Sequence, residues 1–274
     1  MLARYKFLAD GRMPEHAEPP RLCCDSGDAG HRNRNANVGG TGVWETGRVQ
    51  VALASYPGVS ANECEAFTLV FERLVDTDLV RVGERIGRVG GPGGGVVVDR
   101  IFDEVVHPDV VLVPGGLGCA RAAEDHALRA WLCAVAPQCR WLAASSTGTV
   151  IVAAAGLLDE RAAATHWLAG DLLEQYGSTA SAERIVEIGH VITCEGEVTA
   201  MHVALLVALR LTGPDEVARI RAELDRFGRQ ASTVSARPWW RRRPRATPGP
   251  PAPRNPELIA PDVIEFGPLI THPD

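Results

Sequence analysis

Short, continuous apolar runs, each followed by a turn or a helical pattern, recur through the middle of this 274-residue chain. The runs expected to form strands are residues 49–54, 96–98, 110–113, 141–144 and 191–193. Strands without alternating polarity are buried on both faces, which is typical of parallel sheets covered by helices. The pattern therefore predicts an α/β fold with a mostly parallel central sheet and helices on both faces.

The segments between these runs repeat their apolar residues at helical spacing. Helices are expected over residues 63–74, 128–135, 149–155 and 199–211. The Gly-rich residues 90–95 lack the Lys-Ser/Thr pair of a phosphate loop and lead into a strand, so a hairpin or a flexible loop is expected there. Aromatic residues make up only 5% of the chain, and small aliphatic side chains are therefore expected to fill the core.

Composition changes abruptly on either side of this pattern. Residues 1–46 mix Pro, Gly, Asn and charged residues without periodicity and are predicted to form a poorly ordered N-terminal extension. Residues 229–274 form a Pro/Arg-rich C-terminal tail, in which the prolines of 229–256 are not expected to allow a helix or a central strand. Residues 47–228 are predicted to be one globular domain.

The charge balance argues against nucleic acid as the main partner. The net charge is −6, whereas phosphate contacts need clustered Lys and Arg. The basic run at residues 241–245 is better explained as a solvated tail than as a contact to anionic surfaces. No run of about 18 apolar residues suggests a membrane span. The first residues lack the apolar core of a signal peptide, so a cytoplasmic protein without a membrane partner is expected.

The seven cysteines are odd in number and show no C-x-x-C spacing. This pattern indicates neither a disulfide framework nor a zinc site, and it fits a reducing compartment. No metal or other cofactor is expected.

Polar residues that could carry chemistry are expected at the carboxyl ends of strands, where ligands bind in such sheets. These are Glu63, the Gly115-Gly116 pair, Ser146 and His166. The sharp SSTG turn around Ser146 has the outline of a nucleophile elbow, although it is not G-x-S-x-G. By itself, a strand–Ser–helix junction is more typical of a helix N-cap.

Five motifs with these residues occur in a fixed order: Tyr56-Pro57-Gly58, VPGGLG at 113–118, ASSTG at 144–148, AAAGLLD at 153–159 and ATHW at 164–167. With these motifs in this order, the chain resembles the DJ-1/PfpI superfamily, which is class I glutamine amidotransferase-like. It is similar to the isonitrile hydratase-like branch, which also forms the N-terminal half of many AraC-type regulators. The resemblance covers residues 48–215 and implies a flavodoxin-like three-layer sandwich and a homodimer.

The resemblance also implies catalytic positions. The family's reactive Cys corresponds to Ser146, its acid to Glu63 and its Thr-His histidine to His166. A thiol with a pKa of about 8.5 is readily ionised at a helix N-terminus, whereas a serine hydroxyl needs an adjacent base. His166, oriented by Asp171, is the candidate base, and the alternative is that Ser146 only forms hydrogen bonds.

Glu63 is the stronger candidate. A carboxyl packed near Phe67 and the elbow is expected to have a raised pKa and to exchange protons near neutrality. The alternative is an acid in the first helical turn that is stabilised by the helix dipole. Glu65, two residues further along, is expected at the surface.

Substrate-binding residues are expected around the same turn. The backbone amides of Gly116, Leu117 and Thr147 would stabilise developing negative charge. Cys194 is expected to line the pocket, with a small buried Cys as the alternative. Arg121 is a candidate substrate contact, with a surface salt bridge as the alternative.

Two positions that face the site in the branch have changed chemical type, because Cys194-Glu195-Gly196 replaces Ser-Ala-Gly and His202 occupies an Asp position. The fold is therefore better defined than the reaction. The function expected is a hydratase/lyase-type enzyme acting on a small, uncharged or weakly polar metabolite. The family analogue is hydration of an isonitrile, and a noncovalent lyase, isomerase or cyclase step in specialised metabolism is the other form of this hypothesis.

The alternative function is a noncatalytic small-molecule-binding or regulatory protein. The residues after Thr212 are too few for the paired helix-turn-helix units of the AraC-type regulators, so direct regulation of DNA is not expected. A peptidase or glyoxalase reaction is disfavoured because those family chemistries also depend on the Cys that Ser146 replaces.

Overall fold

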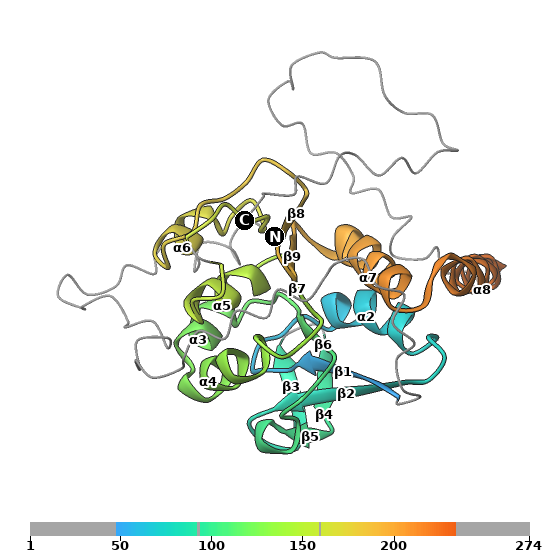
Figure 1. Cartoon of the computed structure of the whole chain (residues 1–274), viewed down its shortest axis with the longest axis horizontal. Coiled ribbons are helices and arrows are strands. Elements are labelled where there is room, and N and C mark those ends of the chain that lie inside the picture. The colour runs from blue at the N-terminus through green and yellow to red at the C-terminus, as the bar shows by residue number, and fades with distance from the viewer. Residues whose placement is uncertain (1–47, 92–93, 159, 234–274) are drawn as a thin grey trace, which may run out of the picture.

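The computed structural model describes residues 48–91, 94–158 and 160–233 (Figure 1). The expectations for residues 1–46 and for the basic run at 241–245 lie outside this part of the chain. A seven-stranded sheet forms its centre. The strands are β1 (Val49–Ala54), β2 (Thr77–Gly83), β5 (Arg100–Ile101), β6 (Val110–Val113), β7 (Trp141–Ser145), β8 (Ile185–Ile188) and β9 (Val191–Cys194).

The strand order is β5-β2-β1-β6-β7-β9-β8, and every neighbouring pair is parallel except β8 with β9. The α/β fold with a mostly parallel sheet is therefore confirmed. The apolar run at 96–98 does not join this sheet. It belongs to β4 (Gly94–Val98), which pairs antiparallel with β3 (Gly87–Gly91) in a two-stranded ribbon. Val97 is half exposed between buried neighbours, so this run is covered on one face only.

Helices cover both faces of the sheet. They are α2 (Ala61–Phe71), α3 (Cys119–Glu124), α4 (His126–Val135), α5 (Gly148–Ala154), α6 (Gly170–Glu174), α7 (Glu197–Thr212) and α8 (Pro214–Thr233), with a 3₁₀ turn η2 (Phe102–Glu104). Figure 1 shows α2 and α7 side by side on one face and α3, α4 and α5 on the other. None of the helices in the described ranges is long and apolar enough to cross a membrane.

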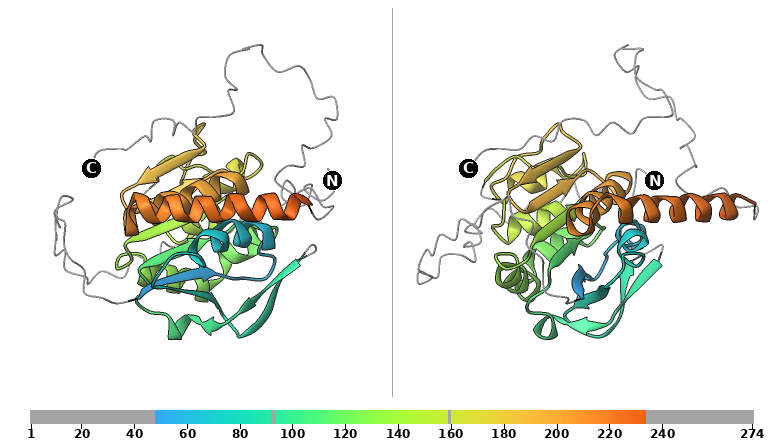
Figure 2. Two further views of the ribbon diagram at one scale, coloured as in Figure 1. Left: turned by 90° about the vertical axis from the view of Figure 1, so that its right-hand side faces the viewer. Right: turned by 45° about the vertical axis from the view of Figure 1, so that its right-hand side comes forward.

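Helix α8 extends past the predicted domain boundary. It continues to Thr233, so the expectation that no helix could form from residue 229 onward is wrong for residues 229–233. The first proline of the tail is Pro238, and nothing in 229–233 prevents helical hydrogen bonding. Buried Val217 and Ile220 anchor the start of α8 to the core, and Figure 2 shows the helix crossing outside the α2/α7 layer.

The central strands place the site. Residues 51–54 of β1 and 110–113 of β6 are fully buried, as their unbroken apolar sequence predicts. Because β1, β6, β7 and β9 run parallel, their carboxyl ends meet at one edge of the sheet. The loops that follow β1, β6, β7 and β9 therefore come together in space.

Candidate functional site

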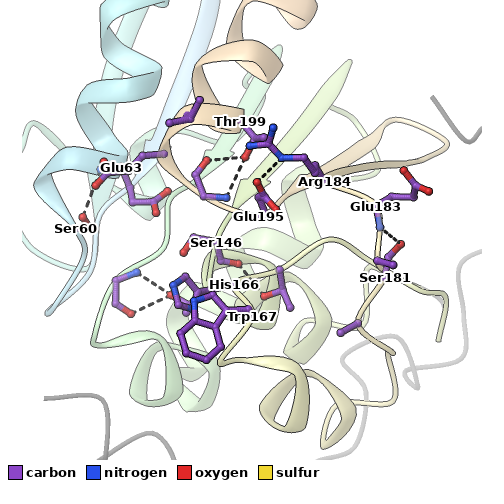
Figure 3. Close-up of a pocket in the computed structure, with 18 of the residues that line it drawn as sticks. Ser60, Glu63, Ser146, His166, Trp167, Ser181, Glu183, Arg184, Glu195 and Thr199 are labelled. Carbon is purple, nitrogen blue, oxygen red and sulfur yellow. Dashed lines mark hydrogen bonds and ion pairs between the residues drawn. The ribbon is translucent and has the colours of Figure 1, made fainter. Parts of the chain in front are cut away.

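A cavity of about 730 Å³ lies at this edge of the sheet (Figure 3). Of the eight residues expected to be catalytic or to bind substrate, six line it: Glu63, Gly116, Leu117, Ser146, Thr147 and His166. In Figure 3, Ser146 lies between Glu63, which comes from α2, and His166. Segments that are far apart in sequence thus contribute to one site.

Ser146 occupies a strained turn between β7 and α5. Its φ of 55° lies in the left-handed region, which non-glycine residues rarely adopt. Two contacts hold the turn: Ser146 N donates to Cys194 O at 2.7 Å, and Thr165 Oγ1 donates to Ser146 O at 2.9 Å. Strained residues of this kind cluster at functional sites, and the geometry is that of a nucleophile elbow.

Two glycines allow the loop after β6 to pack against this elbow. A Cβ on Gly148 would lie 2.2 Å from Val113 O, and one on Gly115 would lie 2.9 Å from Ser146 Cβ. Real Cβ atoms do not approach other atoms so closely. The motifs VPGG and SSTG therefore form one tightly packed unit.

The side chain of Thr147 joins the two loops. Gly116 N donates to Thr147 Oγ1 at 2.8 Å, and the same hydroxyl lies 3.0 Å from Gly116 O. The Gly116 amide is thus already engaged and is not free to bind a developing anion, contrary to its expected role. The expected role of the Leu117 and Thr147 amides as donors to a developing anion stays a prediction.

Glu63 reaches the cavity from the first turn of α2. Ser60 caps this helix, and its Oγ accepts a hydrogen bond from Glu63 N at 3.4 Å. The residue is only 6% exposed, and its side chain lines the cavity together with Ser146. Both sequence interpretations apply: Glu63 is an acid in a first helical turn, but it is buried and faces the site.

Burial raises the pKa of Glu63 to about 7. The negative charge of Glu197 raises it further, whereas hydrogen bonds from the hydroxyls of Ser145 and Ser146 oppose the shift. The Ser145 contact is short, with 2.6 Å between Ser145 Oγ and Glu63 Oε2. At neutral pH the protonated and ionised forms of Glu63 are therefore both populated.

His166 lines the opposite side of the cavity. Its Nδ1 accepts a hydrogen bond from Leu168 N at 3.2 Å, and its ring stacks on Trp167 with 5.7 Å between centroids. Burial lowers the pKa of His166, and the charge of Glu195 opposes this. Asp171 is exposed in the first turn of α6 and does not line the cavity, so its expected role in orienting His166 is not supported.

His166 does not follow a strand. The segment 162–165 is a loop whose only strand-like feature is an isolated bridge between Ala163 and Ala180. Thr165 and Thr149 hold this loop to the elbow, because Thr149 Oγ1 donates to Ala164 O at 2.9 Å. Side-chain contacts, rather than a strand, thus bring His166 to the site.

Three of the positions considered in the sequence lie outside the cavity. Arg121 lines a separate, smaller hollow with Pro57 and Asp125. Cys194 is completely buried behind the elbow, and burial raises the pKa of its thiol, so it matches the alternative of a small core Cys. His202 is half buried on α7 and does not line the cavity.

The wall of the cavity also includes charged residues that sequence reasoning missed. Glu183, Glu195 and Glu197 line it, and Arg184 pairs with Glu195. Glu183 and Arg184 lie in the loop before β8, Glu195 follows β9 in the replaced Ser-Ala-Gly motif, and Glu197 is the first residue of α7. In the described ranges, no group of three or more His, Cys, Asp or Glu side chains is arranged to hold a metal ion.

Apolar side chains lie at the mouth. Leu117, Trp167 and Val198 all line the cavity and are all largely exposed, with Trp167 81% exposed. Isolated exposed apolar residues are normal, but three at one opening form a rim suited to an apolar ligand group.

Comparisons with known proteins agree with this architecture. The sequence pattern of the DJ-1/PfpI family matches residues 49–209. An isonitrile hydratase from Pseudomonas putida is 32% identical over 173 residues, which cover 63% of this chain and 68% of that protein. The glutathione-independent glyoxalase DJR-1.2 from Caenorhabditis elegans is 27% identical over 126 residues, covering 45% of this chain and 67% of the relative.

The fold is also that of a ThiJ/PfpI family protein from Pseudomonas syringae. Its crystal structure matches with a TM-score of 0.61 at 22% identity, over 71% of this chain and 78% of the other. The family pattern spans more than half of the chain and contains the first-helix acid, the elbow and the Thr-His motif. The chain therefore belongs to the DJ-1/PfpI family.

Proposed function

We propose that this protein is a hydratase- or lyase-type enzyme that acts on a small, uncharged metabolite, with Glu63 as both acid and base. One observation carries the proposal: a nearly buried carboxyl with a pKa of about 7 faces the elbow cavity. A group with this pKa can donate a proton and recover it within one turnover at neutral pH.

Hydration of an isonitrile illustrates the chemistry. Protonated Glu63 gives its proton to the terminal carbon, and water adds to the same carbon. The Glu63 carboxylate then takes a proton from the added water, and tautomerisation yields an N-substituted formamide. One water is consumed and Glu63 returns to its starting form. The relative named isonitrile hydratase, which is 32% identical, supports this choice of reaction.

Ser146 is proposed to bind and orient the reactants without forming a covalent bond. A serine hydroxyl needs a neighbouring base to act as a nucleophile. The Nδ1 atom of His166 already accepts a hydrogen bond from Leu168 N, and Glu63 is assigned to proton transfer with the substrate. A hydroxyl on a rigid, left-handed turn is instead well suited to hold a water molecule or a substrate atom.

The charges around the cavity favour a substrate without negative charge. Glu183 and Glu197 add negative potential, and the guanidinium of Arg184 is paired with Glu195. A cleft lined by one sign of charge raises the local concentration of opposite or neutral ligands relative to like-charged ones. The rim of Leu117, Trp167 and Val198 fits an apolar substituent.

A noncatalytic small-molecule-binding protein is the second candidate. The observation that favours it is Ser146 itself, because this hydroxyl stands where the family carries a reactive thiol. In this case the cavity would bind the same class of ligand without converting it.

The two functions are separated by assaying the purified protein with benzyl isonitrile and measuring N-benzylformamide by liquid chromatography. We expect turnover by the wild type and a loss of about 100-fold or more in Glu63→Gln, which keeps shape and hydrogen bonding but removes the titratable proton. Glu65→Gln, an exposed acid two residues along α2, is the matched control and should retain activity.

Saturable binding of benzyl isonitrile without product would favour the noncatalytic function. Undiminished turnover by Glu63→Gln would contradict the acid–base role.

A further inference from the structure

Ser145 contacts Glu63 from behind the cavity. It is the last residue of β7, is 0% exposed and does not line the cavity. Its Oγ donates to Glu63 Oε2 at 2.6 Å. The elbow therefore presents two consecutive serines in different environments, one buried against the acid and one facing the ligand space.

The hydroxyl of Ser145 determines the role of each Glu63 oxygen. A serine hydroxyl carries one proton to donate, and among the described residues Glu63 Oε2 is the acceptor found for it. Oε2 therefore accepts this hydrogen bond when Glu63 is ionised. If Ser145 keeps donating to Oε2 when Glu63 is neutral, the proton of Glu63 lies on the other oxygen, Oε1.

We propose that Ser145 is a positioning residue that holds Glu63 Oε2 and thereby places the exchangeable proton on Oε1, the oxygen left for Ser146 and the substrate. Ser145 itself touches no reactant. The proposal rests on the proposed acid–base function of Glu63, but the contact and its effect on the proton can be measured without any substrate.

Glu63 has few neighbours that favour its charged form. Glu197 on α7 is an acid, and burial raises the pKa values of Cys194 on β9, Cys64 on α2 and Tyr56 after β1, which keeps all three neutral near pH 7. None of these groups stabilises a carboxylate.

The hydrogen bonds from Ser145 and Ser146 are thus the interactions that lower the pKa of Glu63 against burial. A hydrogen bond to an ionised acceptor is stronger than one between neutral groups, and its loss disfavours the charged form. Ser145→Ala should therefore raise the pKa of Glu63 further above its ordinary value.

The first test is a double-mutant cycle on the free energy of unfolding, measured in urea between pH 5 and pH 9. Because burial raises the pKa of Glu63 from 4.5 to about 7, its stabilising contribution is complete below pH 4.5 and is lost as pH rises through about 7. In Ser145→Ala we expect this loss to extend to higher pH and to become larger.

In the Glu63→Gln background, Ser145→Ala should have the same effect on unfolding at pH 5 and at pH 9, because no titrating group remains for it to act on. Ser55→Ala is the matched control: Ser55 is also a buried serine at the end of a strand, but its Oγ donates to Leu53 O. This control should leave the pH dependence of unfolding unchanged.

The second test is the pH profile of kcat with benzyl isonitrile. In Ser145→Ala, the limb controlled by Glu63 should move to higher pH, and kcat should fall while KM stays nearly constant. A pH-independent effect of Ser145→Ala, or an equal pH-dependent effect in both backgrounds, overturns the proposal.

The two proposals fail in different ways. A pH-dependent cycle together with a fully active Glu63→Gln enzyme supports the contact with Ser145 and contradicts the catalytic function of Glu63. An inactive Glu63→Gln enzyme together with a pH-independent cycle supports the catalytic function of Glu63 and contradicts the positioning role of Ser145.

Discussion

At the scale of single residues, the site depends on a strained serine and a buried acid. The left-handed backbone of Ser146 costs about 1–3 kcal/mol, and the contacts to Cys194 and Thr165 offset it. The same contacts fix the direction of the Ser146 side chain relative to Glu63. The strained backbone at Ser146 therefore helps to set the direction of its hydroxyl.

Substitutions of Ser146 test its proposed role. If the hydroxyl only orients the reactants, Ser146→Ala should lose at least about 10-fold less turnover than Glu63→Gln, whereas a nucleophile would make the two losses comparable. Ser146→Cys should increase hydration of benzyl isonitrile, because a thiolate at the start of α5 restores the family's reactive group. Steady-state kinetics of the three variants provide the comparison.

The sequence predicts the positions of those candidate residues that follow an apolar strand. Glu63 and Ser146 could be placed at one edge because their strands are apolar and parallel. Ser145 could not, because its hydrogen bond joins residues 82 positions apart and depends on how α2 packs against β7. Arg121, on the short helix α3, lines a separate hollow and not the cavity, so its role as a substrate contact stays a prediction.

At the scale of elements, buried strands were predictable and partly polar ones were not. β8 contains Glu187, whose carboxylate pairs with both terminal nitrogens of Arg210 on α7 at 2.7 and 2.8 Å. Arg210 in turn lies over the ring of Trp141. Burial of a charged acid in a strand is costly unless a partner neutralises it. The sequence around Glu187 does not show that Arg210 is this partner.

The packing of the elbow against β6 gives a test at this scale. Gly148→Ala should destabilise the protein by about 3 kcal/mol, because the new Cβ would overlap Val113 O. Gly170→Ala, at the start of α6, is the control: its Cβ would lie 3.5 Å from Ala180 Cβ, an ordinary contact. Urea unfolding should show lost stability for the first variant and an unchanged or slightly raised stability for the second.

Equal stability of Gly148→Ala and the wild type would mean that the close approach of the two loops is not required for folding. The elbow would then be held by its hydrogen bonds alone.

At the scale of the whole molecule, we propose that the protein is a homodimer that forms through the sheet edge or the helices beside the elbow. The family resemblance and the prevalence of twofold symmetry among soluble oligomers support this. Light scattering at micromolar concentration should give twice the 29.3 kDa mass of the chain. A mass of one chain at that concentration would count against the dimer.

The fold as a whole produces the raised pKa of Glu63, on which the proposed function depends. Parallel strands bring the start of α2 to the elbow, and burial between these layers makes a glutamate titrate near neutrality. The most direct test is the titration of Glu63 by carbon NMR in protein labelled at the glutamate side-chain carboxyls, with Glu63→Gln identifying its resonance. We predict a midpoint at about pH 7. A midpoint at or below the ordinary value of 4.5 would contradict it.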